Sequence, residues 1–325
     1  MNPCIREQTL TQTQPPQLSV ILATTGDFTT IRRTVEHLHN QTISDQLELV
    51  IVTASPQSLK LDAAATAGFA AVRVISVKHI QTIASANAAG IREASAPIIA
   101  LAEDHSFPEP NWAAELLSAH KTGEYAAVGP RVLNANPNSA ISRADYWIGY
   151  GRWSREDAGG EIDILPGHNS SYRRDLLLAL GDKLESWLES ETVLHWHLRE
   201  QGHRLYLHTP ARTHHVNFSL AKSFFGASFY NGRVFAGARS STWSPLKRLI
   251  YTFASVLIPV IRLWRILRYA ENIDFTGVMV LFAGLVVSAT GEMIGYALGI
   301  GSAREQLRHY EFFRVRHVCH TDVWI

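Results

Sequence analysis

Residues 18–41 have the sequence LSVILATTGDFTTIRRTVEHLHNQ, in which a short apolar run precedes a segment with Ile31, Val35 and Leu38 at helical spacing. An unbroken apolar run predicts a strand buried on both faces, and the spacing predicts an amphipathic helix. The same pattern repeats as far as Pro130. Further strands are expected at 47–54, 70–77, 96–103 and 125–130, and further helices at 84–94 and 110–122. This alternation predicts an α/β fold with a mostly parallel sheet flanked by helices.

Length and composition limit what the chain can be. A length of 325 residues is enough for one large domain or two smaller ones. Lys and Arg number 30 against 29 Asp and Glu, so we expect no nucleic-acid partner. The only cysteines, Cys4 and Cys319, provide no disulfide framework, which is typical of a reducing compartment. The polar segment 1–17 lacks an apolar core, so a disordered lead is expected rather than a secretory signal.

The fourth predicted strand ends in three residues that can bind a metal ion. Residues 98–112 read IIALAEDHSFPEPNW, and Glu103, Asp104 and His105 follow the apolar run directly. Charged groups are costly to bury without partners, and ligands of parallel sheets bind beyond the carboxyl ends of the strands. The pattern therefore indicates a cation site at this edge of the sheet. The alternative is a loop carboxylate that caps the helix beginning near Pro110.

Five segments follow one another in an order that is typical of one enzyme family. They are the strand and helix at 18–41, ELVIVTASP (48–56), ASANAAGIREASAPIIALAEDHSFPEPNW (84–112), PGHNSSYRRDLLLALG (166–181) and ESETVLHWHLREQGHRLY (189–206). This order resembles the family 2 glycosyltransferases, and the resemblance covers residues 18–217. It implies the GT-A fold of nucleotide-diphospho-sugar transferases, and a metal-dependent, inverting transfer of a sugar from a nucleotide-sugar donor.

The resemblance assigns a metal site. Glu103, Asp104 and His105 occupy the Asp-x-Asp position of the family, which holds a divalent ion against the diphosphate; which pair ligates stays open. Such an ion stabilises the charge that develops on the departing diphosphate. Oxygen ligands suit Mn²⁺ or Mg²⁺, and an imidazole favours Mn²⁺. His214 or His215 is expected to complete the site. The alternative is that the pair has no function, because the chain contains 15 histidines and two of them can be adjacent by chance.

The resemblance also assigns a catalytic base. Glu191 falls at the general-base position, where a carboxylate takes the proton of the acceptor hydroxyl as its oxygen attacks the anomeric carbon. Glu189, two residues earlier, is the alternative. Either carboxylate could instead complement the dipole of the helix that follows.

Further residues are predicted to contact the donor or the acceptor. The family commonly ends its second strand in an Asp that contacts the nucleotide, whereas this chain has hydroxyl residues there. Aromatic residues in DYWIGYGRW (145–153) could stack on a sugar or simply pack, and the polar candidates could also be cap, turn or structural residues. The predicted substrate contacts are Thr24, Asp27, Thr53, Ser55, Asn87, Trp147, Trp153, His168 and Asn169.

The apolar segment 246–268 is predicted to lie along a membrane. Its basic residues share one arc of the helix. Burying Arg262 in a spanning helix would cost about 2.5–3.5 kcal/mol, whereas a helix in the interface pairs its basic face with anionic headgroups. We therefore expect an interfacial helix kinked at Pro259.

The second apolar segment, 276–300, has a different pattern. Small residues, including Gly291, Gly295 and Gly299, share one face, which predicts a close helix contact within the chain or in a homo-oligomer. The segment is long enough to span, but the arginines of the tail 302–325 favour a re-entrant or interfacial hairpin with both ends cytoplasmic. The alternative is a buried hairpin in a soluble domain.

The expected organisation is a GT-A domain followed by membrane-associated helices. Its ranges are a lead at 1–17, a catalytic domain at 18–244 (nucleotide-sugar half 18–130, acceptor half 131–244), a membrane-associated hairpin at 245–301 and a tail at 302–325. The expected function is transfer to a lipid-linked or polysaccharide acceptor on the cytoplasmic face of the inner membrane, with lipid contacts through 246–300. One alternative is a catalytically impaired GT-A-like scaffold or partner subunit. A nucleotidyltransferase would need a Gly-rich loop, and ATTGDFTT (23–30) supplies one Gly.

Overall fold

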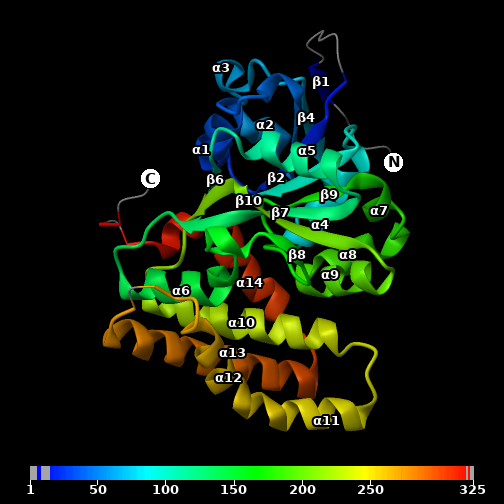
Figure 1. Cartoon of the computed structure of the whole chain (residues 1–325). Helices are drawn as coiled ribbons and strands as arrows, with labels where there is room; N and C mark the ends of the chain where they lie inside the picture. Colours follow the sequence, from blue (N-terminus) through cyan, green and yellow to red (C-terminus); the bar gives the residue numbers. More distant parts are fainter. Residues whose placement is uncertain (1–5, 9–14, 272, 320, 323–325) are drawn as a thin grey trace. The chain divides into compact units, whose positions relative to one another are not determined.

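The chain forms two compact units, and each is described by itself. The computed structural model describes residues 6–8, 15–271, 273–319 and 321–322 (Figure 1). One unit comprises residues 1–132 and 156–214, and the other comprises residues 133–155 and 215–325. The sequence ranges placed 131–244 in one acceptor half, but helices from 133–155 and 215–244 pack on the C-terminal helices and therefore join the second unit.

The first unit is built around a sheet of ten strands that helices cover. Its strands, two of which run on into the second unit, are β1 (Arg6–Gln8), β2 (Leu18–Thr24), β3 (Leu47–Thr53), β4 (Ala71–Ser76), β5 (Ile98–Ala102), β6 (Ser106–Pro108), β7 (Tyr125–Asn134), β8 (Gly160–Ile162), β9 (Ser171–Arg173) and β10 (Arg204–His215). Its helices are α1 (Phe28–His39), η1 (Ser44–Gln46), α2 (Pro56–Leu59), α3 (Ala63–Thr66), α4 (Ile83–Glu93), α5 (Trp112–Thr122), η3 (Glu156–Ala158), α7 (Arg174–Leu178), η4 (Gly181–Lys183), α8 (Leu184–Leu188) and α9 (Glu191–Glu200).

The sheet is mixed rather than mostly parallel. Its order is β1-β4-β3-β2-β5-β9-β7-β10-β6, and β8 pairs with β10. The strands β4, β3, β2 and β5 are parallel to one another, as the strand–helix alternation predicted. Strand β9 runs antiparallel to both β5 and β7, and β8 runs antiparallel to β10. The sequence missed β6, β8 and β9, because three-residue strands carry no readable periodicity.

Apolar packing explains the helices that flank the parallel strands. Strands β2 and β3 are buried along their whole length, and the predicted helical face of α1 lies in the core beside them. Helix α4 comes close to the sheet at Gly90, where a Cβ would lie 3.1 Å from a methyl group of Val52. Its sequence of small residues thus serves close helix–sheet packing.

The N-terminal segment contains a strand within the range that was predicted to be a disordered lead. Residues Arg6–Gln8 form β1, which pairs antiparallel with β4. The rest of that prediction, at 1–5 and 9–14, lies outside the described residues. Strand addition to an open sheet edge needs only backbone hydrogen bonds, so the polar composition of the segment did not indicate it.

The second unit is helical. Its elements are α6 (Ala140–Gly149), η2 (Gly151–Trp153), α10 (Ala221–Arg239), α11 (Pro245–Ala254), η5 (Ser255–Leu257), α12 (Ile258–Ile266), α13 (Phe275–Leu298), α14 (Ala303–Phe312) and η6 (Arg314–His317). Two segments, Pro245–Ile266 and Phe275–Leu298, are long and apolar enough to cross a membrane, by length and composition only. The first is interrupted by η5 immediately before Pro259, where the sequence predicted a kink.

The glycine face of α13 is used within the chain. A Cβ at Gly291 would overlap the carbonyl oxygen of Phe229 in α10, and a Cβ at Gly295 would lie 2.8 Å from Cβ of Ala236. Gly299 ends the helix with a φ of 77°, in the left-handed region that favours glycine. Helix α10 of the same chain therefore covers this face, so Gly291 and Gly295 do not support the predicted homo-oligomer.

A first prediction concerns this contact. We expect Gly291→Ala to lower the free energy of unfolding by about 1–3 kcal/mol, because the added methyl group overlaps the α10 backbone. The matched control is Gly149→Ala in α6, where an added Cβ meets nothing within 4 Å, so we expect no loss. Chemical denaturation of both variants in one detergent measures the difference. Equal stability of the two variants would contradict the packing described.

Candidate active site

The parallel strands bring their carboxyl ends to one edge of the sheet. Leu22 of β2 lies opposite both Ile51 of β3 and Ala102 of β5. The loops after these strands therefore begin side by side, at the edge where open α/β sheets bind ligands. Residues 103–105 follow Ala102 directly, so the structure places the predicted metal motif at this edge.

Glu103 contacts a histidine with each of its carboxylate oxygens. Its Oε1 lies 3.1 Å from Nδ1 of His168, and its Oε2 lies 3.3 Å from Nε2 of His105. The carboxylate of Asp104 lies 2.6 Å from Nδ1 of the same His105 ring. Glu103 and His105 are only 6% and 2% exposed, so these groups form a buried cluster of oxygen and nitrogen donors. Such a mixed set is suited to Mn²⁺ or another first-row transition ion.

Hydrogen bonds hold the backbone around this cluster. The hydroxyl of Thr34 in α1 donates to the carbonyl oxygen of Glu103 at 2.9 Å. Asn169 has a left-handed φ of 59°, and its Nδ2 donates to Oγ of Ser106 at 2.5 Å. Ser106 Oγ also lies 3.0 Å from Oγ1 of Thr213 on β10. Asn169, predicted as a substrate contact, therefore has a structural role that joins the loop after β5 to the segment that carries His168.

Glu191 lies beside the same segment. It is the first residue of α9, after the N-cap Ser190. At Gly167, the residue before His168, a Cβ would lie 2.7 Å from Cδ of Glu191. The lack of a side chain at Gly167 thus lets the Glu191 carboxyl group approach the backbone, and two adjacent residues connect the predicted base with the carboxylate cluster. Glu189, the alternative base, is the C-cap of α8.

A buried histidine anchors α9 one turn after Glu191. Nε2 of His195 lies 2.9 Å from Oη of Tyr172, and Nδ1 accepts from the N–H of Leu165 at 3.4 Å. Burial lowers the pKa of His195 to about 3, so the ring is neutral at pH 7. Burial, and then the charge of Glu191, raises the pKa of Tyr172 well above its usual range. The sequence prediction missed His195, although its i,i+4 spacing from Glu191 places the two on one helix face.

The structure separates the predicted ligands His214 and His215. They are the last two residues of β10, so their side chains point to opposite faces of the strand. Nε2 of His214 lies 3.1 Å from Oε1 of Glu109. His215 is buried, with its Nε2 3.0 Å from Oη of Tyr150 and its Nδ1 3.1 Å from Oδ1 of Asn217. Only one of the two can share the face of β10 that carries Thr213.

Most of the predicted nucleotide contacts take part in local turns. Thr24 and Thr53 end β2 and β3 opposite each other, and each hydroxyl accepts from the N–H two residues later at 3.1 Å. For Thr53 that N–H belongs to Ser55, whose exposed side chain makes no capping hydrogen bond to α2. Asp27 is the N-cap of α1, and the hydrogen bond from the Thr29 hydroxyl lowers the pKa of Asp27. The cap alternative for Asp27 thus has a structural basis.

Buried oxygen atoms near the strand ends that have no hydrogen-bond partner within the described part of the chain include Oδ1 of Asn87 in α4 and Oγ1 of Thr25, which directly follows β2. Oδ1 of Asn169 is another. Asn87 is only 3% exposed. Unpaired buried oxygens are rare in native structures and call for a ligand or a water. Asn87 stays a predicted donor contact, and Thr25 is a candidate that the sequence patterns did not single out.

The predicted aromatic contacts belong to the second unit. The ring centroids of Trp147 and Tyr146 lie 5.2 Å apart, and those of Trp147 and Tyr269 lie 6.2 Å apart. Trp153 lies 6.4 Å from the ring of Tyr150. Trp147 packs beside an apolar cluster, which accords with the packing alternative. A role in acceptor binding stays a prediction for both tryptophans.

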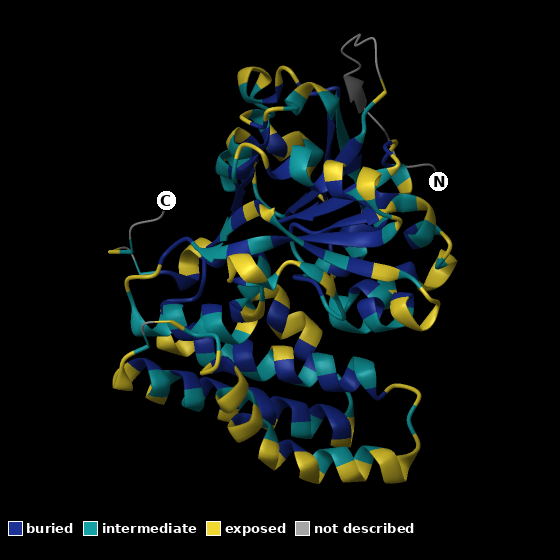
Figure 2. Cartoon of the chain, viewed as in Figure 1, coloured by how far each residue is buried: buried dark blue, intermediate teal, exposed yellow. Residues whose placement is uncertain are grey.

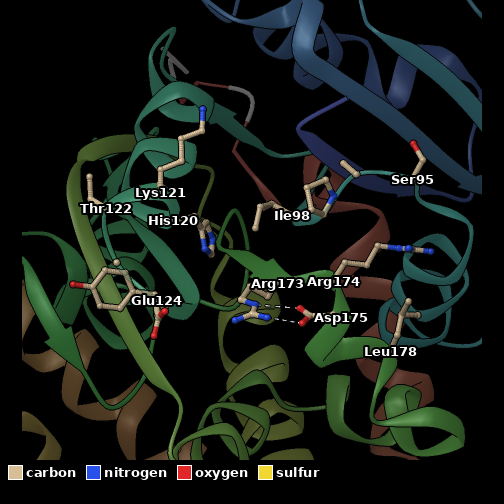
Figure 3. A pocket seen from close by; sticks show the side chains of 14 residues that line it. Ser95, Ile98, His120, Lys121, Thr122, Glu124, Arg173, Arg174, Asp175 and Leu178 are labelled. Atoms are coloured by element: carbon tan, nitrogen blue, oxygen red, sulfur yellow. Dashed lines mark hydrogen bonds and ion pairs between the residues drawn. The ribbon is translucent and has the colours of Figure 1, made fainter. Parts of the chain in front are cut away.

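A concavity lies in the first unit, at the amino-terminal end of β5 (Figure 3). It has a volume of about 700 Å³, and Ile98, the first residue of β5, lines it. Arg173 forms an ion pair with Asp175 at 2.5 Å, and Arg174 donates to backbone carbonyl groups. Because two of its arginines already have partners, we do not place a diphosphate there.

The sheet order and the site define the class of protein. A parallel β4-β3-β2-β5 half, an antiparallel continuation and acidic residues after β5 form a GT-A-like glycosyltransferase domain. The family described as "Glycosyl transferase family 2" matches residues 19–181. The chain belongs to this family.

The other comparisons add nothing to the family assignment. A comparison with curated proteins finds no match. Among solved structures, the "Crystal structure of GalNAc-T7 with UDP, GalNAc and Mn2+" is similar at 14% sequence identity and a TM-score of 0.49. The similarity covers 62% of this chain and 43% of that chain, so this chain spans less than half the length of that protein.

A second prediction follows from two histidines, the buried His195 and the partly buried His120, whose pKa values are lowered by burial. The folded-state pKa values are about 3 for His195 and about 4 for His120, below the unfolded value of 6.5, so only the unfolded chain gains these protons as pH falls from 6.5. Each histidine thus lowers the free energy of unfolding by about 1.4 kcal/mol per pH unit in that window. His195→Gln and His120→Gln should each remove one such contribution. Denaturant titrations at several pH values check this; a variant slope equal to that of the wild type would contradict it.

Proposed function

We propose that this chain transfers a sugar, with inversion, from a nucleotide-sugar to a saccharide or lipid-linked acceptor, using a divalent ion. The observation that carries the proposal is the segment 167–168. His168 contacts the Glu103 carboxylate, and Gly167 lies against the Glu191 carboxyl group. A donor diphosphate and an acceptor hydroxyl must be held close together, and this segment links the groups suited to each.

The donor set fits a divalent cation. Glu103 and Asp104 supply carboxylate oxygens, and His105 and His168 supply ring nitrogens within 3.3 Å of those carboxylates. Burial of Glu103 leaves its charge costly unless a cation or a histidine compensates it. When bound, the ion would neutralise the departing diphosphate. Glu103 and His105 would hold it, with His168 beside them. Asp104, on Nδ1 of His105, would orient the His105 ring.

Of the two histidines at the end of β10, we propose His215 as the further ligand. Residues 213 and 215 share one face of the strand, because successive side chains alternate. The hydroxyl of Thr213 faces Ser106, the residue directly after His105. His214 lies on the other face and contacts Glu109.

Glu191 is the proposed general base. Its carboxyl group would accept the proton of the acceptor hydroxyl as the oxygen attacks the anomeric carbon. The neutral His195, hydrogen-bonded to Tyr172, holds α9 and so positions Glu191 without competing for the proton. On the donor side, the buried oxygens of Asn87 and Thr25 are the groups proposed to accept hydrogen bonds from the nucleotide.

A third prediction tests the ion and the donor together. We expect one nucleoside diphosphate with Mn²⁺ to stabilise the protein by about 2.7 kcal/mol at a concentration a hundredfold above its Kd. Glu103→Gln should abolish this stabilisation, because the substitution removes the central charge of the cluster. The matched control is Glu115→Gln, whose carboxylate pairs with His208 elsewhere in the first unit. Thermal-shift titrations measure the effect; no response to any nucleotide with any divalent ion would favour the scaffold alternative.

A fourth prediction tests the base. Glu191→Gln should lower kcat by about 10²–10⁴-fold and leave Mn²⁺–nucleotide stabilisation intact, because it removes only proton transfer. Gly167→Ala should also lower kcat, since the added methyl group displaces the Glu191 carboxyl group. Glu189→Gln is the matched control and should retain activity. Sugar transfer measured for the three variants decides between the carboxylates: a loss in Glu189→Gln and not in Glu191→Gln would reverse the assignment.

A further inference from the structure

We propose that the outer face of α11 and α12 binds the surface of an anionic bilayer, and that α13 does not cross it. The protein would then be held by one leaflet, with both ends of the second unit on one side. This inference does not depend on the proposed sugar transfer. If the acceptor is lipid-linked, the inference implies that the protein binds this acceptor at the level of the lipid headgroups.

The first observation is that apolar side chains of α11 and α12 remain exposed. Figure 2 shows exposed residues along this segment. Phe253 is 70% exposed, Val256 69% and Val260 62%. Soluble monomers rarely expose so large a contiguous apolar patch. The exposed apolar side chains of this segment are Leu246, Leu249, Ile250, Phe253, Val256, Leu257, Val260, Ile261, Trp264 and Leu267.

The second observation is that three polar residues of the same segment, Arg248, Ser255 and Arg262, face inward. Arg248 donates to the carbonyl oxygens at the end of α13, at 2.8 and 3.3 Å. Ser255 is buried, and Arg262 lies 3.6 Å from the buried carboxylate of Glu292 in α13. A helix on the surface of a water-soluble protein shows the opposite arrangement, with its apolar side inward. The segment is therefore built for an apolar surrounding on its outer side.

The third observation is the charge beside this face. Lys247, Arg265 and Arg268 are exposed, and residues 245–268 contain no acidic residue. Anionic headgroups attract such side chains, with about 1 kcal/mol for each Lys or Arg near the surface. A second copy of the chain would bring the same positive charges together, so the charge pattern favours a bilayer as the occupant.

The fourth observation is that α13 is an inner layer of the second unit. Its glycine face is covered by α10, and α11 and α12 lie on it as well. Helix α10 in turn packs on α14, where Tyr310 meets Gly226, and α14 exposes Arg304 and Arg308.

If α13 crossed the bilayer, α10 would cross beside it, because the two helices contact each other from Gly284 to Gly295. Helix α10 exposes Lys222 at its start and Asn231 in its middle, and polar side chains inside a bilayer are costly unless they face the protein interior or water. A membrane that contacts only α11 and α12 avoids this cost. The length of α13 therefore reflects packing inside the helical unit.

Vesicle flotation of the full chain tests the surface. We expect binding to vesicles of phosphatidylcholine with phosphatidylglycerol, and weaker binding to phosphatidylcholine alone. Phe253→Asp with Val260→Asp should reduce the bound fraction by about tenfold or more, whereas Arg304→Gln with Arg308→Gln on α14, the matched control, should not change it. Lys247→Gln and Arg268→Gln should each weaken binding to anionic vesicles by about fivefold.

Unchanged vesicle binding by the Phe253→Asp, Val260→Asp variant would overturn the proposal. So would a wild-type dimer in detergent-free solution that this variant dissociates, since a second copy would then be the occupant. Circular dichroism and the Mn²⁺–nucleotide response of each variant show separately whether the first unit is intact. Failure of membrane binding is therefore distinguishable from failure of the proposed transfer.

Cysteine labelling tests the topology. In a Cys4→Ser background, Cys319 reports on the C-terminal end and Ser58→Cys reports on the first unit. In sealed inside-out vesicles from expressing cells, we expect a membrane-impermeant maleimide to label both positions equally before and after permeabilisation. Labelling of one position only after permeabilisation would show that α13 spans the bilayer.

Discussion

One buried carboxylate fixes the register of the parallel half of the sheet. Glu48 of β3 has no exposed surface, and it accepts hydrogen bonds from the hydroxyl of Ser19 in β2 and from the N–H and hydroxyl of Ser95, at 2.7 and 2.9 Å for Ser95. It also forms a 2.7 Å ion pair with Arg73 of β4. Strands β2, β3 and β4 and the segment that leads into β5 are thereby tied together. Because a slip of one residue would leave this charge unpaired, the opposite ends align, and residues 103–105 emerge at the ligand-binding edge.

The sequence predicted the strands and helices whose hydrophobic pattern is strong. It did not predict the tertiary contacts that set the positions of these elements. The apolar runs of β2, β3 and β5 and the spacing in α1 predicted the parallel half almost to the residue. Glu48 lies inside one such run, but its partners are 29 and 47 residues away, a separation that no local pattern reveals. The antiparallel strands β6, β8 and β9 are equally hidden, since their pairing depends on tertiary contacts.

In the candidate site, too, the sequence predicted which residues take part but not the contacts between them. Order and chemistry pointed to Glu103, Asp104, His105 and Glu191, and the structure brings the first three together. Two adjacent residues connect that cluster with Glu191. Gly167 has no side chain and so leaves room for the Glu191 carboxyl group, and the imidazole of His168 contacts Glu103. Only the structure shows that the Glu191 carboxyl group occupies the space that a side chain at residue 167 would need. His195 was hidden for a related reason, because its hydrogen bond to Tyr172 joins a helix to a three-residue strand.

In the second unit, α11 and α12 expose apolar side chains, whereas an amphipathic helix of a water-soluble protein usually buries them. A helical wheel shows that 246–268 has a polar and an apolar side, but it does not show which side faces the rest of the chain. In the structure the Arg262 guanidinium and the Glu292 carboxylate meet between α12 and α13, and burial raises the pKa of Glu292 while Arg262 opposes that rise. Because Arg262 points away from the outer face and pairs with Glu292, its charge is not placed in the apolar surroundings of that face. The surface that remains is apolar and flanked by cations, and a bilayer surface satisfies both properties at once.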